Sequence, residues 1–390
     1  MNESNDKGLR IALDARWIFE KISGVGRVTE NLIRHLPVVD KRNHYVFIFD
    51  DEQRMERIKK ECASGFYNNV ETLLFPYRIF SLKSQMKLSR FLKKNAIDVF
   101  HSTNFMIPLH RCRAKEIITI HDLIPLIFPH LTPKSRKNRF FRLYKLIMHR
   151  IVKIADAIIA DSKNTERDIL RFFPNTEGKI RVVYCGIDDR YFEPLPFKAH
   201  HFLRERYGIK GPIIITAGRA DPYKNTLGLV KAFEMLLPKC AEQPHLVIIG
   251  EDDPRYPEAH QYVADKLPAG TVTFTGYLDE KHMPAAYASA DIMVHPSMYE
   301  GFGLPPLEAM AVGTPVISSN KSSLPEILSD AAIYVDPDNI EEMSTAIIYL
   351  LNNPEERKIL GGRGKQHAAK FRWESSAKEI ARIYEEVAYK

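Results

Sequence analysis

Cysteine and long apolar runs are scarce in this chain. Its 390 residues include four cysteines, Cys62, Cys112, Cys185 and Cys240, and no Cys-x-x-Cys pair, which predicts reduced thiols and no zinc site. No apolar run approaches the ~20 residues of a membrane span, and the polar start MNESNDKGLR is not typical of a signal peptide. Low-complexity tracts and short repeats are also missing. We therefore expect a cytosolic protein, long enough for two domains.

Negative charge is scarce in the first half of the chain only. Residues 1–195 hold 35 Lys and Arg against 23 Asp and Glu, a net charge of +12, whereas the remaining residues net −5. This asymmetry indicates that the first half meets something anionic, either a membrane surface or nucleic acid. Because zinc-finger, RNA-recognition and helix-turn-helix signatures are absent, we expect no nucleic-acid partner.

Two basic amphipathic stretches stand out in the first half, residues 83–94 and residues 134–153. Both alternate Lys and Arg with apolar residues at helical spacing. The interpretation we favour is a surface helix whose apolar face packs on a sheet. The alternative is a helix that rests on anionic lipid, where each basic residue adds ~1 kcal/mol. The apolar positions are Leu82, Met86, Phe91 and Leu92 in the first stretch, and Phe140, Phe141, Tyr144, Ile147, Met148 and Ile151 in the second.

Short apolar runs alternate with helical patterns along the whole chain, which predicts parallel sheets wound with crossover helices. Pro194 and Pro196 indicate a linker, so we expect domains at 1–195 and 196–372, followed by a helix at 373–390. The expected strands are Leu9–Asp14, Tyr45–Phe49, Asp98–His101, Ile117–Ile120, Asp156–Ala160, Ile180–Tyr184, Pro212–Ala217, Leu246–Ile249, Val272–Thr275, Ile292–Val294 and Thr314–Ser318.

The most informative stretch is residues 295–325, HPSMYEGFGLPPLEAMAVGTPVISSNKSSLP. A strand leads into a glycine turn and then a helix, and the helix start offers free N–H donors to an anion. Glu300 on the turn and Glu308 near the helix start can face one cleft at the carboxyl end of a strand. Their carboxylates could accept hydrogen bonds from sugar hydroxyls. Alternatively, Glu300 is a solvated turn residue and Glu308 favours only the helix terminus.

Three further strand ends carry candidate site residues. The turn with Gly24, Gly26 and Arg27 has the strand, glycine and helix order that binds phosphate, although a purely structural turn is the simpler interpretation. It lacks the third glycine of a dinucleotide site, so no nicotinamide cofactor is expected. His121 ends a strand and could equally be a core histidine. Arg219 and Lys224 follow another strand, and this pair of cations suits a diphosphate, although surface loops often hold two cations.

The strings EGFGLPPLEA and TIHDLIPLIFP resemble the retaining, nucleotide-sugar-dependent glycosyltransferases of family four. That resemblance implies the GT-B fold: two Rossmann-like α/β domains that face a cleft, with the last helix crossing back to the first domain. It also implies sugar and diphosphate contacts by His121, Glu300, Arg219 and Lys224. The other substrate contacts that it implies are Gly24, Gly26, Arg27, Asp122, Leu278, Glu280, Gly301, Phe302, Gly303, Leu304 and Glu308.

Mannosyltransferase-like members that build bacterial surface polysaccharides resemble the chain most. We therefore expect retaining transfer of mannose from GDP-mannose to a lipid-linked saccharide, on the inner face of the cytoplasmic membrane. Neither a cofactor nor a metal ion is expected, because Arg219, Lys224 and glycine amides can offset the leaving diphosphate's charge. The alternatives are a transferase that uses UDP-glucose or another nucleotide sugar on a soluble acceptor, and a catalytically silent scaffold.

Overall fold

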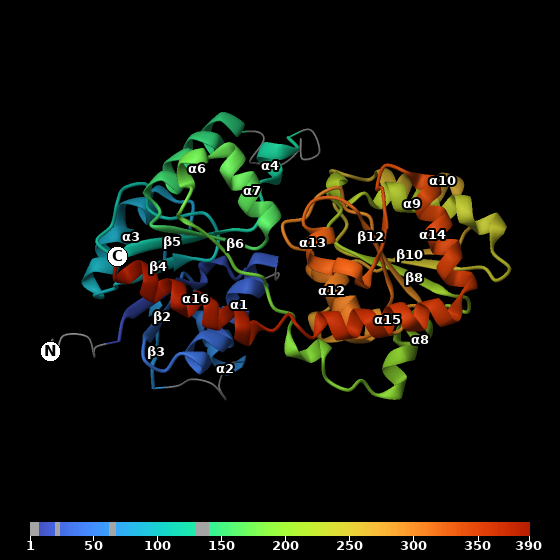
Figure 1. Ribbon diagram of the computed structural model, residues 1–390, viewed down its shortest axis with the longest axis horizontal. Coiled ribbons are helices and arrows are strands. Elements are labelled where there is room, and N and C mark those ends of the chain that lie inside the picture. The colour runs from blue at the N-terminus through green and yellow to red at the C-terminus, as the bar shows by residue number, and fades with distance from the viewer. Residues whose placement is uncertain (1–7, 20–23, 62–67, 130–139) are drawn as a thin grey trace. The chain divides into compact units, whose positions relative to one another are not determined.

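The structure is a computed structural model that describes residues 8–19, 24–61, 68–129 and 140–390. Its internal contacts divide the chain into two compact units (Figure 1). Unit 1 comprises residues 1–123, 140–186 and 372–390, and unit 2 comprises residues 124–139 and 187–371. In the described ranges, no helix is both long enough and apolar enough to cross a bilayer.

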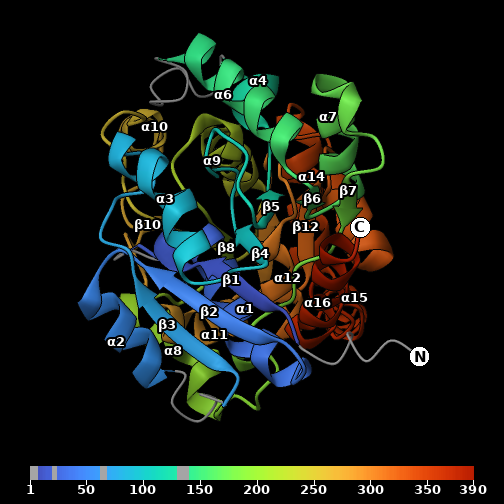
Figure 2. The same ribbon diagram turned by 90° about the vertical axis from the view of Figure 1, so that its left-hand side faces the viewer.

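Unit 1 is built on a parallel sheet of seven strands in the order β3-β2-β1-β4-β5-β6-β7. The first two views place α6 and α7 on one side of this sheet and α1 and α16 on the other (Figures 1 and 2). The strands are β1 Arg10–Asp14, β2 His44–Phe49, β3 Val70–Leu74, β4 Val99–Ser102, β5 Lys115–Ile120, β6 Ala157–Ala160 and β7 Ile180–Val182. The helices are α1 Gly24–Val39, α2 Glu52–Glu61, α3 Leu82–Lys94, α6 Phe141–Ile154, α7 Lys163–Phe172 and α16 Trp373–Ala388.

Unit 2 repeats this plan with six parallel strands in the order β10-β9-β8-β11-β12-β13. The strands are β8 Ile213–Ala217, β9 His245–Ile249, β10 Val272–Phe274, β11 Ile292–His295, β12 Val316–Ser319 and β13 Ile333–Val335. The helices are α4 Ile124–Ile127, α8 Phe202–Tyr207, α9 Thr226–Leu236, α10 Glu258–Lys266, α11 Met283–Ala288, α12 Leu304–Ala311, α13 Leu324–Leu328, α14 Ile340–Asn352 and α15 Pro354–Ala368.

Apolar side chains on both faces of the strands explain why each sheet carries helices on two sides. In unit 2, alternate strand residues such as Ile214, Val294 and Ile317 belong to one core cluster with Phe233 of α9 and Ile347 of α14. Their neighbours along the strands are buried as well, and they point to the opposite face because side chains alternate along a strand. Continuous apolar runs of this kind predicted the doubly wound α/β fold, which the structure confirms.

Strand order reverses once in each sheet, between β1 and β4 in unit 1 and between β8 and β11 in unit 2. The connections that follow the two neighbouring strands at such a point run to opposite sides of the sheet. A crevice therefore opens at the carboxyl ends of these two strands. Most candidate residues of both units follow strands at or beside these two points, whereas Leu278 and Glu280 follow β10 at the edge of the unit 2 sheet.

α16 completes unit 1 from the far end of the sequence. It packs beside α1, and its Tyr384 hydroxyl lies 2.7 Å from Nδ1 of His101 on β4, with both side chains fully buried. Arg181 of β7 forms an ion pair with Glu386. The predicted return of the last helix to the first domain is therefore confirmed.

Three local predictions are wrong. The glycines expected in a loop lie in the first turn of α1, where N–H groups have no acceptor within the helix and glycine is tolerated; the preceding Ser23 lies outside the described residues. The strands β3 and β13 were not predicted: β3 is a half-exposed edge strand without a continuous apolar run, and β13 is an edge strand of three residues. On α3, Leu82 and Met86 are exposed instead of packed, while Leu88 and Leu92 face the core. In the second basic stretch, residues 134–139 lie outside the described part.

Candidate active site

The candidate site of unit 2 forms where the loops after β8 and β11 meet. The amide of Met298 donates to the carbonyl of Tyr223 at 2.7 Å, which joins the two loops. Lys224 ends a short 3-10 helix, and Asn225 then takes a left-handed conformation with a φ of 57°. The Asn225 amide Nδ2 donates to the carbonyl of Pro337 at 2.7 Å and fixes this bend. The bend directs Lys224 toward the β11 loop.

Glu300 receives two hydrogen bonds on one carboxylate oxygen. Its Oε1 lies 2.6 Å from Nζ of Lys224 and 2.9 Å from Nε2 of His295, the last residue of β11. The three side chains are 11%, 15% and 2% exposed for Glu300, Lys224 and His295. The Glu300 amide also donates to Oγ of Ser322 at 2.9 Å. Backbone and side chain of Glu300 are thus both held in place.

The charge of Glu300 is stabilised by these partners. Burial alone would raise the pKa of this carboxyl group, but the ammonium of Lys224 and the ring of His295 outweigh burial and hold the pKa far below its usual range. Glu300 is therefore a carboxylate at neutral pH. Because a lysine has three N–H donors, the contact with Glu300 leaves Lys224 able to donate to a second anion.

The turn from Glu300 to Gly303 is anchored by Ser323. Its Oγ lies 2.9 Å from the carbonyl of Glu300 and 3.0 Å from the carbonyl of Phe302. In a trans peptide the N–H points opposite to the C=O, so the amides that follow these two carbonyls, those of Gly301 and Gly303, point away from Ser323. Gly303 heads α12 with a φ of 106°, and a Cβ there would lie 2.8 Å from Leu324. Only glycine suits this position.

Glu308 lies on α12, one turn beyond its first residue Leu304. The carboxylate is 3% exposed, and the Tyr287 hydroxyl lies 3.4 Å from its Oε2. Leu278, after β10, is also buried, and Glu280 begins another 3-10 helix. The predicted sugar, ribose and base contacts of unit 2 therefore all follow strands of one sheet, on the carboxyl side.

Arg219 and Lys224 differ in their surroundings, although they follow the same strand. The Arg219 side chain is 72% exposed, and its Nε lies 2.9 Å from Asp221. It also lines a hollow of about 320 Å³ beside α9 and α10, together with Gly250 and His260. The exposed Arg219 side chain therefore lies at the rim of this hollow, whereas the Lys224 side chain is held within the loop.

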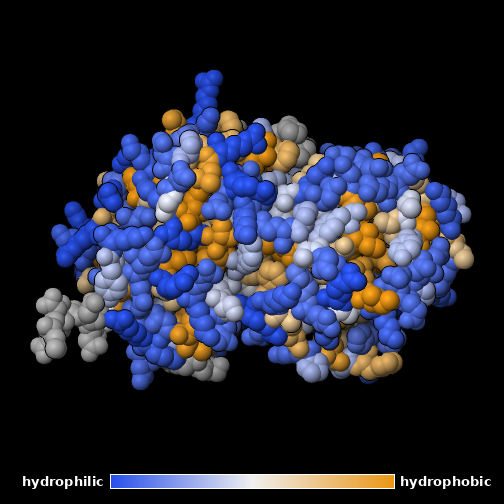
Figure 3. Space-filling model, viewed as in Figure 1, coloured by the Kyte–Doolittle hydropathy of each residue, from blue (hydrophilic) through white to orange (hydrophobic). Residues whose placement is uncertain are grey.

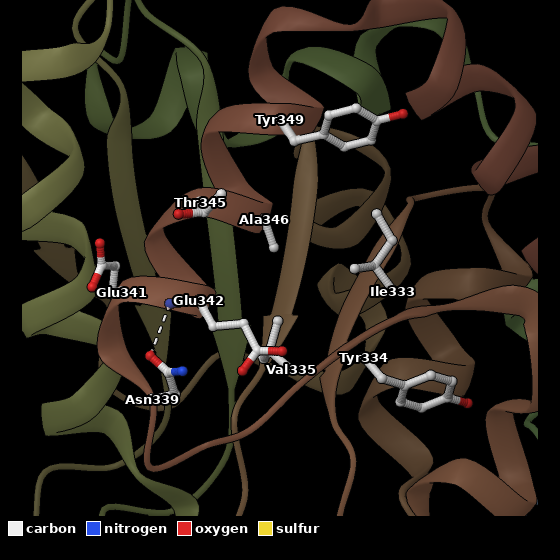
Figure 4. A pocket seen from close by; sticks show the side chains of 9 residues that line it. All are labelled: Ile333, Tyr334, Val335, Asn339, Glu341, Glu342, Thr345, Ala346 and Tyr349. Carbon is white, nitrogen blue, oxygen red and sulfur yellow. Dashed lines mark hydrogen bonds between the residues drawn. The ribbon is translucent and has the colours of Figure 1, made fainter.

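A larger hollow, of about 540 Å³, lies elsewhere in unit 2. It runs between β13 and α14, with Tyr334 and Tyr349 at its rim (Figure 4). Asn339 caps α14 there by accepting from the amide of Glu342. None of the predicted site residues lines this hollow, so we do not include it in the candidate site despite its larger volume.

The described part of the chain contains no group of three or more His, Cys, Asp or Glu side chains arranged for a metal ion. One Asp-x-Asp triplet does occur, Asp336-Pro337-Asp338. Its first carboxylate forms an ion pair with Lys321 at 2.9 Å and accepts from the Asp338 amide at 3.0 Å. Asp336 therefore already engages its own neighbours.

In unit 1, the ends of three adjacent strands meet at His121. Its Nδ1 lies 2.5 Å from the carboxylate of Asp161, after β6, and its Nε2 lies 2.8 Å from the carbonyl of Thr103, after β4. Since both partners are acceptors, both ring nitrogens must carry a proton to satisfy them. Burial opposes that charge, but Asp161 outweighs burial and raises the pKa of His121.

The first turn of α1 is tied to the same edge of unit 1. Thr29 of α1 and Thr103 share a hydroxyl hydrogen bond of 2.6 Å. Gly26 is buried and Arg27 is half-buried in this turn, while Gly24 is exposed. Asp122, half-buried, follows His121 and adds to the raised pKa of that ring. The structure thus brings the predicted unit 1 residues together at the carboxyl edge of the unit 1 sheet.

Sequence reasoning assigned no role in the site to His295, Asp161 or Thr103; for Asp161 it predicted, together with Ser162, a cap of the following helix, and the structure gives that cap to Ser162. His295 does stand at the end of an apolar strand, five residues before Glu300, and Asp161 ends an apolar strand in the same way as His121. A polar residue directly after a buried parallel strand was the available signal.

Two family models together match most of the chain. Residues 201–367 match the model described as Glycosyl transferases group 1, and residues 22–191 match the model described as Glycosyltransferase Family 4. The O-antigen chain mannosyltransferase B of Escherichia coli is 28% identical over 378 residues, which cover 93% of this chain and 96% of that protein. The serotype-specific mannosyltransferase WbdA of Escherichia coli is 25% identical over 283 residues, which cover 71% of this chain but only 34% of that protein.

Solved structures of similar fold cover nearly the whole chain. Sucrose-phosphate synthase from Thermosynechococcus elongatus superposes with a TM-score of 0.76 at 21% identity, covering 97% of this chain and 99% of that one. Anabaena HepE in complex with UDP-glucose superposes with a TM-score of 0.74 at 17% identity, covering 97% of this chain and 100% of that one. At these identities the likeness shows the fold alone.

Proposed function

Because the chain belongs to the GT-B glycosyltransferases of family four, we propose that it transfers mannose from GDP-mannose to a saccharide hydroxyl, with retention at the anomeric carbon. The observation that carries the proposal is the Lys224–Glu300–His295 cluster beside the first turn of α12. It joins a fixed carboxylate, suited to sugar hydroxyls, to a cation suited to a phosphate.

In this proposal the donor diphosphate lies at the start of α12. Lys224, together with Arg219 swinging from the rim, offsets the charge that develops on the leaving group, and the turn amides near Gly303 add donors. Glu300 orients the mannose through its hydroxyls. Since the Lys224 ammonium and the hydrogen bond with the His295 ring lower the basicity of Glu300, it is a poor nucleophile, and we assign it to positioning.

The nucleoside is assigned to the neighbouring strand ends of unit 2. Glu308 would accept from the ribose hydroxyls, Leu278 would pack on the base, and Glu280 would accept from the ring N–H and amino group of guanine. No metal ion and no cofactor takes part, because the two cations and the helix terminus supply the positive charge.

The acceptor is assigned to unit 1 and is a growing, lipid-linked saccharide of a bacterial surface polysaccharide. The name of one relative, O-antigen chain mannosyltransferase B, supports a polysaccharide acceptor. The first turn of α1 provides donors for saccharide hydroxyls there, and His121, whose two ring N–H groups already donate to Asp161 and Thr103, is assigned to the sugar contact through its positive charge. We place the reaction on the cytoplasmic side of the membrane, where nucleotide sugars are made.

Thermal unfolding without divalent metal tests the donor. GDP and GDP-mannose should raise the unfolding temperature, because a ligand bound only to the folded state adds about 2.7 kcal/mol at a hundred times its Kd. UDP, ADP and dTDP serve as controls. An increase in unfolding temperature with UDP-glucose alone would indicate UDP-glucose as the donor. No increase with any nucleotide would favour the catalytically silent scaffold.

Glu300→Gln tests the catalytic assignment. It should retain the shift with GDP but lose mannosyl transfer and slow hydrolysis of GDP-mannose by about a hundredfold, since removing one oriented polar contact costs that much in many enzymes. Product analysis by proton NMR reports the anomeric configuration, and inversion would contradict retention.

A further inference from the structure

The α3 and α6 surface of unit 1 carries an unusual number of exposed apolar side chains. Large apolar residues scattered singly on a surface are ordinary, whereas a group of them indicates a contact. Six gather on α3, on α6 and on the residues just before each helix. They are Leu82 at 82% exposed, Met86 at 77%, Leu146 at 68%, Phe80 at 61%, Phe140 at 60% and Leu143 at 55%; we call this set the α3–α6 apolar surface.

The two helices flank one loop, so the set forms a single region. Phe105 in that loop packs its ring 6.2 Å from Phe80 and 5.9 Å from Tyr144 of α6. Leu109, in the same loop, donates its amide to Gln85 of α3 and accepts at its carbonyl from Arg150 of α6. Figure 3 shows apolar side chains among hydrophilic ones on the face of unit 1 that is turned toward the viewer.

The charged side chains of the two helices have one sign. α3, with the sequence LKSQMKLSRFLKK, and α6, with FRLYKLIMHRIVKI, contain no Asp or Glu. Their Lys and Arg residues are exposed on the same faces as the apolar set: Lys83, Lys87, Arg90, Lys93, Lys94, Arg142, Lys145, Arg150 and Lys153. Apolar residues surrounded by cations are typical of a helix lying in the interface of an anionic bilayer.

We infer that the α3–α6 apolar surface enters the headgroup region of an anionic lipid bilayer while the surrounding Lys and Arg side chains bind lipid phosphates. A second copy of the chain fits less well, because a twofold contact would oppose like charges. The inference differs from a purely electrostatic contact, since the apolar side chains themselves are buried in lipid.

The α3–α6 apolar surface lies close to the residues assigned to the acceptor. Phe80 precedes α3 and packs 5.7 Å from Trp17, which follows β1, and Trp17 donates to Ser102 at the end of β4. The apolar residues therefore border the carboxyl edge of the sheet, the same edge that carries His121. This step rests on the proposed lipid-linked acceptor: a bilayer at this surface holds the lipid anchor beside the acceptor residues.

Vesicle sedimentation tests the inference. The wild-type chain should sediment with phosphatidylcholine vesicles that contain about a third phosphatidylglycerol, and binding should weaken at high salt without disappearing. The double variants Leu82→Gln/Met86→Gln and Leu143→Gln/Leu146→Gln should each bind about tenfold more weakly. The matched control Phe197→Gln/Ile359→Gln changes side chains of unit 2 that are 80% and 53% exposed and should bind like the wild type.

Equal vesicle binding by all variants would overturn the inference. So would a wild-type dimer that the same variants dissociate in analytical ultracentrifugation while no chain sediments with lipid, because a second copy would then cover the surface. Hydrolysis of GDP-mannose without vesicles separates this inference from the proposed function: the variants should keep that activity, and its absence in the wild type would count against the donor assignment only.

Discussion

Glu300 shows how unit 2 holds a charge at a strand end. Taking a carboxylate and an ammonium out of water costs several kcal/mol per ion, and two donors on the same oxygen offset that cost. Such an arrangement adds little net stability, but it fixes the direction of the Lys224 and His295 side chains. Positioning before ligand binding is what electrostatic catalysis requires.

Lys224→Met should lower the free energy of unfolding by about 3 kcal/mol, because it leaves Glu300 buried with one partner fewer. Adding Glu300→Gln should recover much of this loss, since the unpaired charge is then removed. Urea denaturation at neutral pH measures both variants. Lys321→Met is the control, because the Lys321–Asp336 pair is exposed and its loss should hardly change the midpoint; a similar drop in both lysine variants would contradict the role of burial.

His121 makes the unit 1 edge sensitive to pH. Its pKa is raised in the folded chain, so the contact with Asp161 contributes fully below the usual imidazole pKa of about 6.5 and is lost as pH rises through the folded pKa. Asp161→Asn should lower the His121 pKa, because burial then dominates. A proton NMR titration, with His121→Gln to assign the resonance, measures the shift; an unchanged pKa would show that Asp161 does not hold the charge.

At the scale of elements, α15 supports the helix that carries Glu308. Two adjacent glycines of α15 have opposite surroundings. A Cβ on Gly361 would lie 2.3 Å from the carbonyl oxygen of Gly313, just beyond α12, whereas a Cβ on Gly362 would meet nothing within 4 Å. Close packing of α15 on the end of α12 therefore depends on one of these glycines only.

Gly361→Ala should destabilise the chain by about 2 kcal/mol, since backbone must move to admit the methyl group. Gly362→Ala should stabilise it by about 0.5 to 1 kcal/mol, because alanine is the better helix former. Thermal unfolding of the two variants gives the comparison directly. Equal effects of either sign would contradict the packing of α15 against the Gly313 carbonyl.

Most strands of both sheets were predictable from the sequence, because a buried parallel strand is a short, continuous apolar run. The pairings Lys224–Glu300 and His121–Asp161 were not, because they depend on which strand ends become neighbours. Leu82 and Met86 were misplaced for another reason: α3 has two apolar stripes, and periodicity does not say which stripe the sheet covers. The candidate site was thus predictable as a set of residues but not as a set of contacts.

At the scale of the whole molecule, unit 1 depends on α16. This helix buries Trp373, Ile380 and Tyr384 and contributes the hydroxyl partner of His101. Burial lowers the pKa of His101 to about 3, so the ring stays neutral and needs that hydrogen bond.

A chain that ends at Phe371 should lose the cooperative unfolding of unit 1 while unit 2 stays folded and still responds to GDP. Limited proteolysis followed by mass spectrometry identifies the degraded segment. Tyr384→Phe is the milder control: it keeps the helix, removes one buried hydrogen bond and should cost about 1–3 kcal/mol. A truncated chain whose residues 8–123 resist protease as the full chain does would contradict the dependence.

The division of unit 1 into three stretches of sequence also sets an order of synthesis. A ribosome delivers residues 187–371, most of unit 2, before it delivers α16. The seven strands of unit 1 are therefore synthesised long before the helix that packs on them, and until α16 emerges the surface that it will cover stays open to chaperones and proteases. The unit with the basic, apolar surface therefore completes its packing only after α16 has been made.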